Sequence, residues 1–114
     1  MKDEPKGAAA ARLRQRKYQI LKSLVIPPEA LPGSLSRTLT RCGKPNCHCA
    51  RGKGHPRWVL TYMLKSRRQV EAIPADWAEE IGARVQAGRA LKDAVDEILT
   101  ANARLLVLRR QQRR

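Results

Sequence analysis

Near its N-terminus the chain alternates apolar and basic residues with the spacing of a helix. Leu13, Ile20, Leu21 and Leu24 form a narrow apolar stripe that arginines and lysines surround. Pro5 suits a first helical turn, where its missing N–H has no partner to lose. We predict a helix from about Pro5 to Leu24, ended by the prolines and glycine of the segment IPPEALPGS.

The pattern changes to strict alternation in the middle of the chain. SLSRTLTR alternates over its whole length, and WVLTYML has four large side chains on one side: Trp58, Leu60, Tyr62 and Leu64. QVEAI follows after the polar link KSRR. Alternation with period two is typical of strands with one buried face. We predict three antiparallel strands, the last two of which form a hairpin.

A long helix is predicted from Asp76 to about Arg110. Asp76 is a good N-cap, and Glu79 three residues later completes the pattern of a capping box. Only Gly82 and Gly88 interrupt the segment, and glycine weakens a helix without ending it.

An apolar seam follows this helix with the spacing of a coiled coil. Its members are separated by four, three, four and three residues: Leu91, Val95, Ile98, Asn102 and Leu105. An asparagine at a core position of a two-stranded seam fixes register. We predict association through this seam, with a second copy as a homodimer or with a partner protein. The alternative is a helix folded back on its own domain, with Asn102 in solvent.

The composition indicates one modest domain that binds a polyanion. The 114 residues lack phenylalanine, and aromatic residues make up only 4% of them, so the core is thin. The net charge is +14, which favours nucleic acid or an anionic surface as a partner. We expect no membrane span and no signal peptide, because no apolar run is long enough. We therefore expect a cytoplasmic protein, nucleoid-associated if it binds DNA.

Three cysteines and two histidines lie together in RCGKPNCHCARGKGHPRW and nowhere else. Cys42, Cys47, Cys49 and His55 have the spacing C-x4-C-x-C-x5-H, and three thiolates with one imidazole suit a tetrahedral zinc ion. We predict one structural zinc in a zinc-finger-like knuckle. His48, between two cysteines, would point away from the metal that they share, and it stays open as the alternative fourth ligand. A disulfide or redox role and unliganded cysteines also stay open.

These residues also carry a resemblance. The segment PGSLSRTLTRCGKPNCHCARGKGHPRWVLTYM, followed by AIPADW, resembles a small bacterial zinc-knuckle family of unknown function. Its members share PGS, then CGKPNC-x-C, a glycine and a histidine, an aromatic-rich strand and a helix. The similarity covers residues 32 to about 98, and it departs where this chain has Pro56-Arg57-Trp58 instead of Gly-Pro-Tyr. The resemblance brings no activity, but it implies a setting near transposases and other mobile-element genes.

The positive charge gathers around the cysteines. Between positions 34 and 73 there are nine basic residues and a single acid, Glu71, so local ion pairs cannot neutralise the positive charge. We predict that these nine bind nucleic acid, DNA rather than RNA, together with two arginines of the C-terminal tail: Arg37, Arg41, Lys44, Arg51, Lys53, Arg57, Lys65, Arg67, Arg68, Arg109 and Arg110. The tail arginines suit the dipole of their own helix equally well. Trp58 and Tyr62 could stack on bases, but their place on the apolar face favours core packing.

The sequence predicts an α+β protein in three parts. Residues 1–33 form a basic helix and a proline-rich linker, residues 34–75 a zinc-knuckle β domain, and residues 76–114 a long helix with a basic tail. We predict a zinc-stapled nucleic-acid-binding accessory or regulatory protein linked to a mobile element. The alternative is an adaptor that binds a partner protein through its long helix, within a larger nucleoprotein complex. We expect no enzyme, because paired carboxylates, a glycine-rich phosphate loop and a Ser-His-Asp set are absent from the sequence.

Overall fold

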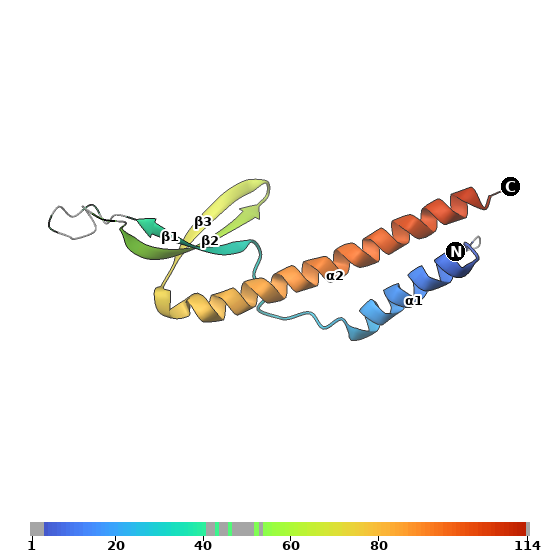
Figure 1. The fold of residues 1–114 in the computed structure, drawn as a ribbon, viewed down its shortest axis with the longest axis horizontal. Helices are drawn as coiled ribbons and strands as arrows, with labels where there is room; N and C mark the ends of the chain where they lie inside the picture. Colours follow the sequence, from blue (N-terminus) through green and yellow to red (C-terminus); the bar gives the residue numbers. More distant parts are fainter. Residues whose placement is uncertain (1–3, 41–42, 44–45, 47–51, 53, 114) are drawn as a thin grey trace. The chain divides into compact units, whose positions relative to one another are not determined.

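The computed structural model describes residues 4–40, 43, 46, 52 and 54–113. It confirms the predicted α+β class (Figure 1). The elements follow in the order α1 (Ala8–Ser23), β1 (Ser34–Thr40), β2 (His55–Leu64), β3 (Arg67–Ile73), the short 3-10 helix η2 (Ala75–Trp77) and α2 (Ala78–Gln111). The chain divides into two compact units. Unit 2 consists of residues 28–89 and holds the sheet, and unit 1 consists of residues 1–27 and 90–114.

The sheet of unit 2 has the predicted three antiparallel strands in the order β1-β2-β3. Strand β2 begins at His55, three residues before the alternating segment that predicted it, because His55 still pairs with Thr40 of β1. Strand β3 begins at Arg67, inside the expected polar link. The β2–β3 turn is therefore only Lys65-Ser66, and both residues have positive φ, of 50° and 68°. That geometry matches the twist of a two-residue hairpin, although glycine or asparagine is usual there.

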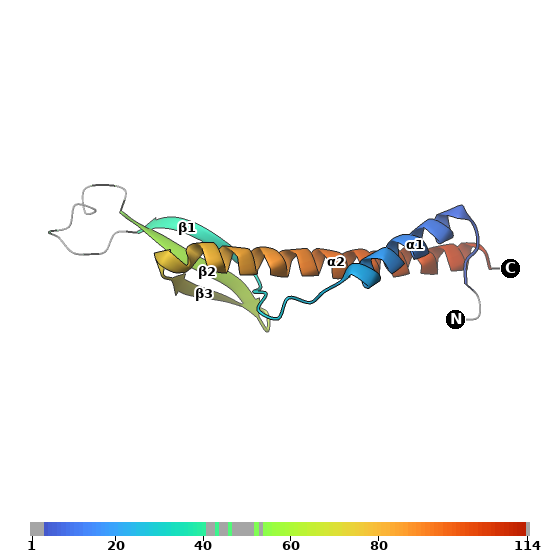
Figure 2. The same cartoon turned by 90° about the horizontal axis from the view of Figure 1, so that it is seen from below.

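The core of unit 2 lies between one face of the sheet and the first turns of α2 (Figure 2). Leu60 of β2 packs with Ile81 and Val85 of α2, and four half-buried side chains surround them: Leu31, Leu35, Tyr62 and Ile73. Tyr62 thus joins the core, as its alternation predicted. Leu64 lies on the same face but is 54% exposed. We call this side of the sheet the helix-facing side and the other the open side.

A backbone segment also lies directly on α2 in unit 2. The Leu31 amide donates a 2.9 Å hydrogen bond to the Arg84 carbonyl, and the Arg84 Nε donates a 2.7 Å bond to the Glu29 carbonyl. A Cβ on Gly88 would collide with the Leu31 carbonyl oxygen. Gly88 is therefore required where the segment lies on the helix, a role that helix propensity did not predict. A Cβ on Gly82 would meet only the Leu35 Cδ2 at 3.7 Å, an ordinary contact.

Helix α2 does not begin with the predicted capping box. Pro74, with φ −54°, starts a 3-10 turn in which the Trp77 amide donates to the Pro74 carbonyl at 2.9 Å. Asp76 lies inside this turn, whose N-cap is Pro74, and no side-chain hydrogen bond caps the turn. An N-cap needs an extended backbone, which the proline-initiated turn does not leave at Asp76.

Helix α1 is shorter than predicted because it begins at Ala8, not at Pro5. Gly7 has φ 108° and separates the two. Pro5 is buried instead, and its carbonyl accepts a 2.8 Å bond from Arg14 Nη1. The backbone of Lys6 exchanges two bonds with the side-chain amide of Gln112, of 2.8 Å from the Lys6 N–H and 2.7 Å to the Lys6 carbonyl. In unit 1, α1 therefore runs antiparallel to the C-terminal part of α2.

The seam between these two helices differs from the predicted one. Ala10 and Ile20 of α1 are buried, as are Ala101 and Leu105 of α2. Asn102 is exposed and accepts a 2.9 Å hydrogen bond from Lys17 Nζ. Within this chain Asn102 therefore lies at the surface, as in the alternative of a helix folded back on its own domain. Association through Asn102 with a second copy or a partner protein stays a prediction.

The buried side of α2 still follows heptad spacing, but it contains Ala94 and Ala101 in place of Val95 and Asn102. Its buried or half-buried residues are Leu91, Ala94, Ile98, Ala101, Leu105 and Leu108. Small alanine side chains let two helices approach closely, which explains the preference for Ala101 over Asn102.

Candidate metal and nucleic-acid site

Three of the four predicted zinc ligands belong to the segment that connects β1 to β2, and the fourth, His55, is the first residue of β2. Thr40, the last residue of β1, pairs with His55, the first residue of β2. The chain therefore leaves and re-enters the sheet at adjacent positions, and residues 41–54 connect them. Cys42, Cys47 and Cys49 lie outside the described residues, as does His48. His55 is half-buried and lies on the open side of the sheet, since it alternates with the core residue Leu60.

Among the residues that the structure describes, no group of three or more histidine, cysteine or acidic side chains is placed to hold a metal ion. Within the same ranges, no helix combines the length and apolarity that a membrane span requires.

The predicted basic residues divide between the two sides of the sheet. Arg41, Lys44, Arg51 and Lys53 lie outside the described residues. Arg57 pairs with Thr38, and Arg68 pairs with Met63, which places both arginines on the open side. Arg37 pairs with Trp58, and Arg67 pairs with Leu64, which places both on the helix-facing side. The four arginines and the turn residue Lys65 are exposed. The sheet thus brings Arg57 and Arg68 to one surface and separates Arg37 and Arg67 from it.

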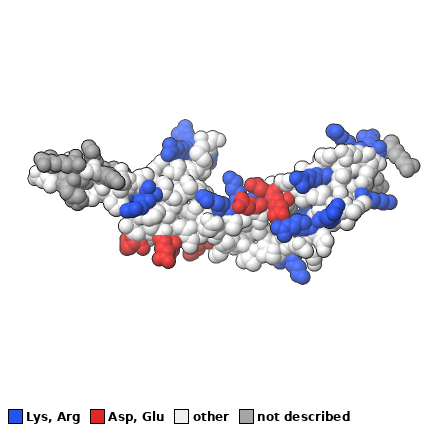
Figure 3. All heavy atoms as spheres, viewed as in Figure 1, with Lys and Arg blue, Asp and Glu red and all other residues white. Residues whose placement is uncertain are grey.

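The three described strands contribute no acidic residue to the open side. Apart from His55, its other described side chains are hydroxyl-bearing, small or apolar: Ser34, Ser36, Thr38, Val59, Thr61, Met63, Val70 and Ala72. Glu71 pairs with Leu60 and lies on the helix-facing side, and Asp76, Glu79 and Glu80 lie at the start of η2 and α2. Figure 3 shows acidic side chains at that end of α2 and basic ones at the β2–β3 turn. The acids of these elements thus lie on the helix-facing side, together with Arg37 and Arg67, while the charged side chains that the strands place on the open side are all basic.

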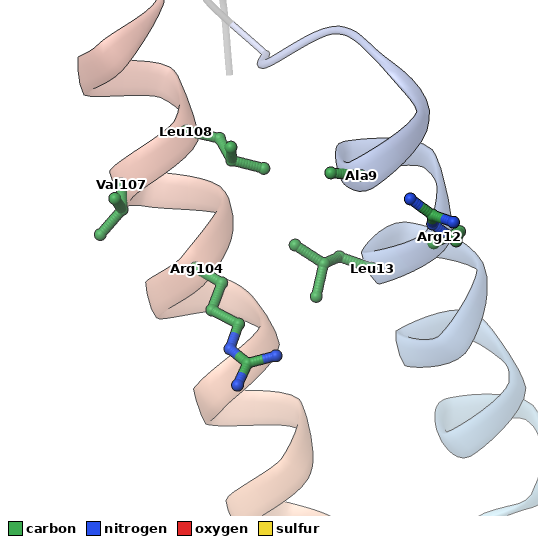
Figure 4. A pocket seen from close by; sticks show the side chains of 6 residues that line it. All are labelled: Ala9, Arg12, Leu13, Arg104, Val107 and Leu108. Atoms are coloured by element: carbon green, nitrogen blue, oxygen red, sulfur yellow. The ribbon is translucent and has the colours of Figure 1, made fainter.

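Arg109 and Arg110 lie in the last turn of α2, where positive charge complements the helix dipole. Nearby in unit 1, a groove of about 440 Å³ lies between the helices (Figure 4). Ala9, Leu13 and Leu108 are directed toward it in that view, and Arg12, Arg104 and Val107 complete its lining. Its lining holds no acid, thiol or histidine, so the groove offers no acid–base or nucleophilic chemistry.

An ion pair on the surface of unit 1 joins Arg16 Nε to Glu97 Oε1 at 2.7 Å. The hydrogen bond from Arg16 lowers the pKa of Glu97, and the same bond raises the pKa of Arg16. Both side chains are about half exposed, at 59% and 45%, so solvent screens the interaction and its contribution to stability is small.

Sequence reasoning missed two features of this site. The pairing of Thr40 with His55 could have been found by extending the strand register past Trp58. The separation of the arginines between the two sides follows from the same register, because residues on each strand alternate sides.

These features define the class of the molecule. It is an α+β protein in which a long helix packs on a three-stranded antiparallel sheet and a cysteine-bearing segment connects the first two strands. The chain belongs to the family described as Domain of unknown function (DUF6788), whose model matches residues 10–83. The resemblance to a family of unknown function is thereby confirmed, although the match begins and ends earlier than residues 32–98. No curated protein and no solved structure matches the chain significantly.

Proposed function

We propose that this protein is a zinc-stapled nucleic-acid-binding accessory protein, and that it binds through the open side of its sheet and the adjoining cysteine segment. The observation that carries the proposal is the distribution of charge in unit 2. The open side presents Arg57 and Arg68 with hydroxyl groups and no strand acid, while the acids gather on the helical side. Arginine and hydroxyl side chains are the common partners of phosphate oxygens.

The cysteine segment extends this surface. Residues 41–54 contain four basic residues and no acid, and they join β1 and β2 at the end where His55 lies on the open side. A nucleic-acid backbone that passes Arg68 and then Arg57 toward His55 would next meet the basic residues of this segment. Arg37 and Arg67, on the other side, would contribute only to the long-range field.

Zinc fits the donor set of that segment. Three thiolates and one imidazole suit a closed tetrahedral site, which has structural and not catalytic chemistry. Cys42 follows Thr40 by two residues, which span at most about 7 Å, and Thr40 is paired with His55. This short connection supports a shared ion for Cys42 and His55, and such an ion would fix the basic segment beside the open side.

The mobile-element setting rests on the resemblance alone. An accessory role near transposases suits a small basic module.

Metal analysis tests the proposed structural zinc site. We expect one equivalent of zinc per chain in protein purified without added metal. Cys42→Ser and His55→Ala should each lose it and lower the melting temperature, whereas His48→Ala should keep it. Retention of zinc by His55→Ala together with its loss in His48→Ala would assign the fourth ligand to His48. Zinc below half an equivalent in the parent would overturn the proposal.

Two matched double variants test the binding surface. Arg57→Glu with Arg68→Glu changes the open side, and Arg37→Glu with Arg67→Glu makes the same change in charge on the helix-facing side. In a mobility-shift titration over a range of salt concentrations, the slope of log K against log salt should flatten by roughly 0.9 for each duplex phosphate that the variant no longer neutralises. We expect this only in the open-side pair. Equal effects in both pairs would show that net charge and not this surface governs binding.

The exposed apolar side chains of unit 1 favour the adaptor as a second candidate function. Several large ones stay in solvent on the two helices, among them Leu99 and Leu106.

A further inference from the structure

Unit 1 leaves a second apolar stripe uncovered. On α2, Val95, Leu99 and Leu106 follow one another at intervals of four and seven residues, and they are 39%, 59% and 61% exposed. On α1, Tyr18 and Leu21 are three residues apart, and they are 64% and 53% exposed. Residues at these intervals lie on one face of a helix. Exposed large side chains are ordinary when scattered, but a contiguous set marks an interaction surface.

A hydrogen bond shows that the two stripes lie on the same side of the helical hairpin. Asn102 comes three residues after Leu99 and four before Leu106, so it belongs to the stripe of α2. Lys17 comes four residues before Leu21, so it borders the stripe of α1. The 2.9 Å bond from Lys17 Nζ to Asn102 Oδ1 therefore joins the two stripes. The Arg16–Glu97 ion pair lies on the opposite side of the hairpin, since Glu97 is two residues from both Val95 and Leu99.

Positive charge borders this surface at both ends. Lys92 precedes Val95 by three residues, and Arg109 and Arg110 follow Leu106 by three and four. On α1, Arg14 and Lys22 lie four residues on either side of Tyr18. Six basic residues, Lys17 included, thus border the stripe, against the single acid Asp96, three residues before Leu99.

We propose that this surface, made by Tyr18, Leu21, Val95, Leu99 and Leu106, binds an acidic amphipathic helix of a partner protein. Such a helix would place its apolar residues along the stripes as the third helix of a small bundle, with carboxylates toward the bordering lysines and arginines. The inference goes beyond nucleic-acid binding, because it concerns the other unit of the chain.

A second copy of the chain is the poorer occupant. In a two-fold symmetric dimer each stripe would contact the same stripe of the second copy. The basic residues that border the two stripes would then lie opposite each other. Like charges placed opposite each other at an interface disfavour association. The amide of Asn102 in the middle of the stripe also suits a helix with a polar side chain at that level, whereas a lipid surface offers no such partner at the depth of the leucines.

Fluorescence anisotropy with a designed probe tests the proposal. The probe is a fluorescein-labelled helical peptide of three heptads with leucine at the a and d positions and glutamate at the flanking ones. One control peptide has lysine in place of every glutamate, and another has serine in place of every leucine. The full-length protein should bind the acidic leucine peptide at least tenfold more tightly than either control.

Paired variants of the protein locate the binding. Leu99→Ser with Leu106→Ser should weaken peptide binding at least tenfold. Val107→Ser, which changes a half-exposed apolar residue off the stripe, should leave it unchanged. Both proteins should keep the helical circular dichroism and the nucleic-acid affinity of the parent, so that failure here is distinct from failure of the proposed function.

Other outcomes would overturn the inference. Equal binding of the lysine peptide would remove the charge argument. Sedimentation of the parent as a dimer that Leu99→Ser dissociates would assign the surface to a second copy. Binding to vesicles of phosphatidylserine and phosphatidylcholine that the same substitution abolishes, without peptide binding, would assign it to a membrane surface.

Discussion

In unit 2 a backbone segment rests directly on a helix, whereas the helices of unit 1 meet through side chains. The Leu31 amide bonds to the Arg84 carbonyl, and Gly88 leaves no space for a methyl group beneath the Leu31 carbonyl. In unit 1, by contrast, the interface consists of side chains with heptad spacing, with Ala101 and Leu105 buried at its centre. The backbone contact requires glycine at a single position, whereas the side-chain interface distributes its stabilisation over many residues.

This difference explains why the two units place different demands on the sequence. A backbone contact tolerates no added atom, because the segment cannot move away from the helix without straining the bonds that join Leu31 to Arg84 and Arg84 to Glu29. A side-chain seam relaxes around a change, and its cost follows the apolar volume removed. Substitutions matched within a single helix therefore provide the sharpest tests of the comparison.

The largest effect is expected for Gly88→Ala. The new methyl group would meet the Leu31 carbonyl oxygen, and we expect a loss of about 3 kcal/mol in the free energy of unfolding, since overpacking commonly costs this much. The matched change Gly82→Ala adds only a 3.7 Å contact with Leu35 and should stabilise α2 by about 0.5–1 kcal/mol. Urea unfolding followed by tryptophan fluorescence measures both, because both tryptophans belong to unit 2. Equal effects of the two substitutions would contradict the close contact.

A smaller effect is expected for Leu105→Ala in the seam of unit 1. Leu105 is 8% exposed, whereas its neighbour Leu106 is 61% exposed. Removing the buried side chain should cost about 2 kcal/mol, and Leu106→Ala should change stability by less than about 0.5 kcal/mol. Circular dichroism at 222 nm follows the helices. The tryptophan signal of unit 2 should move less than the helical signal in Leu105→Ala. Equal losses of stability in the two variants would contradict the burial of Leu105 and the exposure of Leu106.

The smallest effect concerns the pH dependence of unit 1. The hydrogen bond from Arg16 lowers the pKa of Glu97 in the folded chain below its unfolded value, which is about 4.3. The resulting stabilisation is fully present above that pH and is lost as the pH falls through the lower folded value. Because solvent screens the pair, we expect only a small difference between the parent and Glu97→Gln at pH 7. It should vanish in thermal unfolding once the pH has fallen below the lowered pKa of Glu97 in the folded chain, and a difference that grew on acidification would contradict the assignment.

The fold was predictable where hydrophobic periodicity was unambiguous. The three strands and both helices were expected, and the alternation of WVLTYML correctly placed Leu60 and Tyr62 in the core. The ends of the elements were less predictable, because Gly7 and Pro74 act through backbone dihedral angles that side-chain patterns do not report.

The site was predictable only in part. Residue types identified the candidate zinc ligands, of which the structure describes His55 alone. The division of the arginines between two sides of the sheet required the strand register. The side of α2 that packs within the chain was not predicted, because alanine carries little hydrophobic signal and the larger residues through Val95 and Asn102 outweighed Ala94 and Ala101 in the pattern.

The discontinuity of unit 1 has a kinetic consequence. Its two helices belong to segments that flank residues 28–89, so the pairing of Arg16 with Glu97 closes a loop that contains all of unit 2. The β2–β3 hairpin, by contrast, closes across two residues. Short loops close at lower entropic cost than long ones, and local contacts form first. We therefore expect the sheet to fold before the helices meet, and the folded sheet to shorten the distance that the helices must then search.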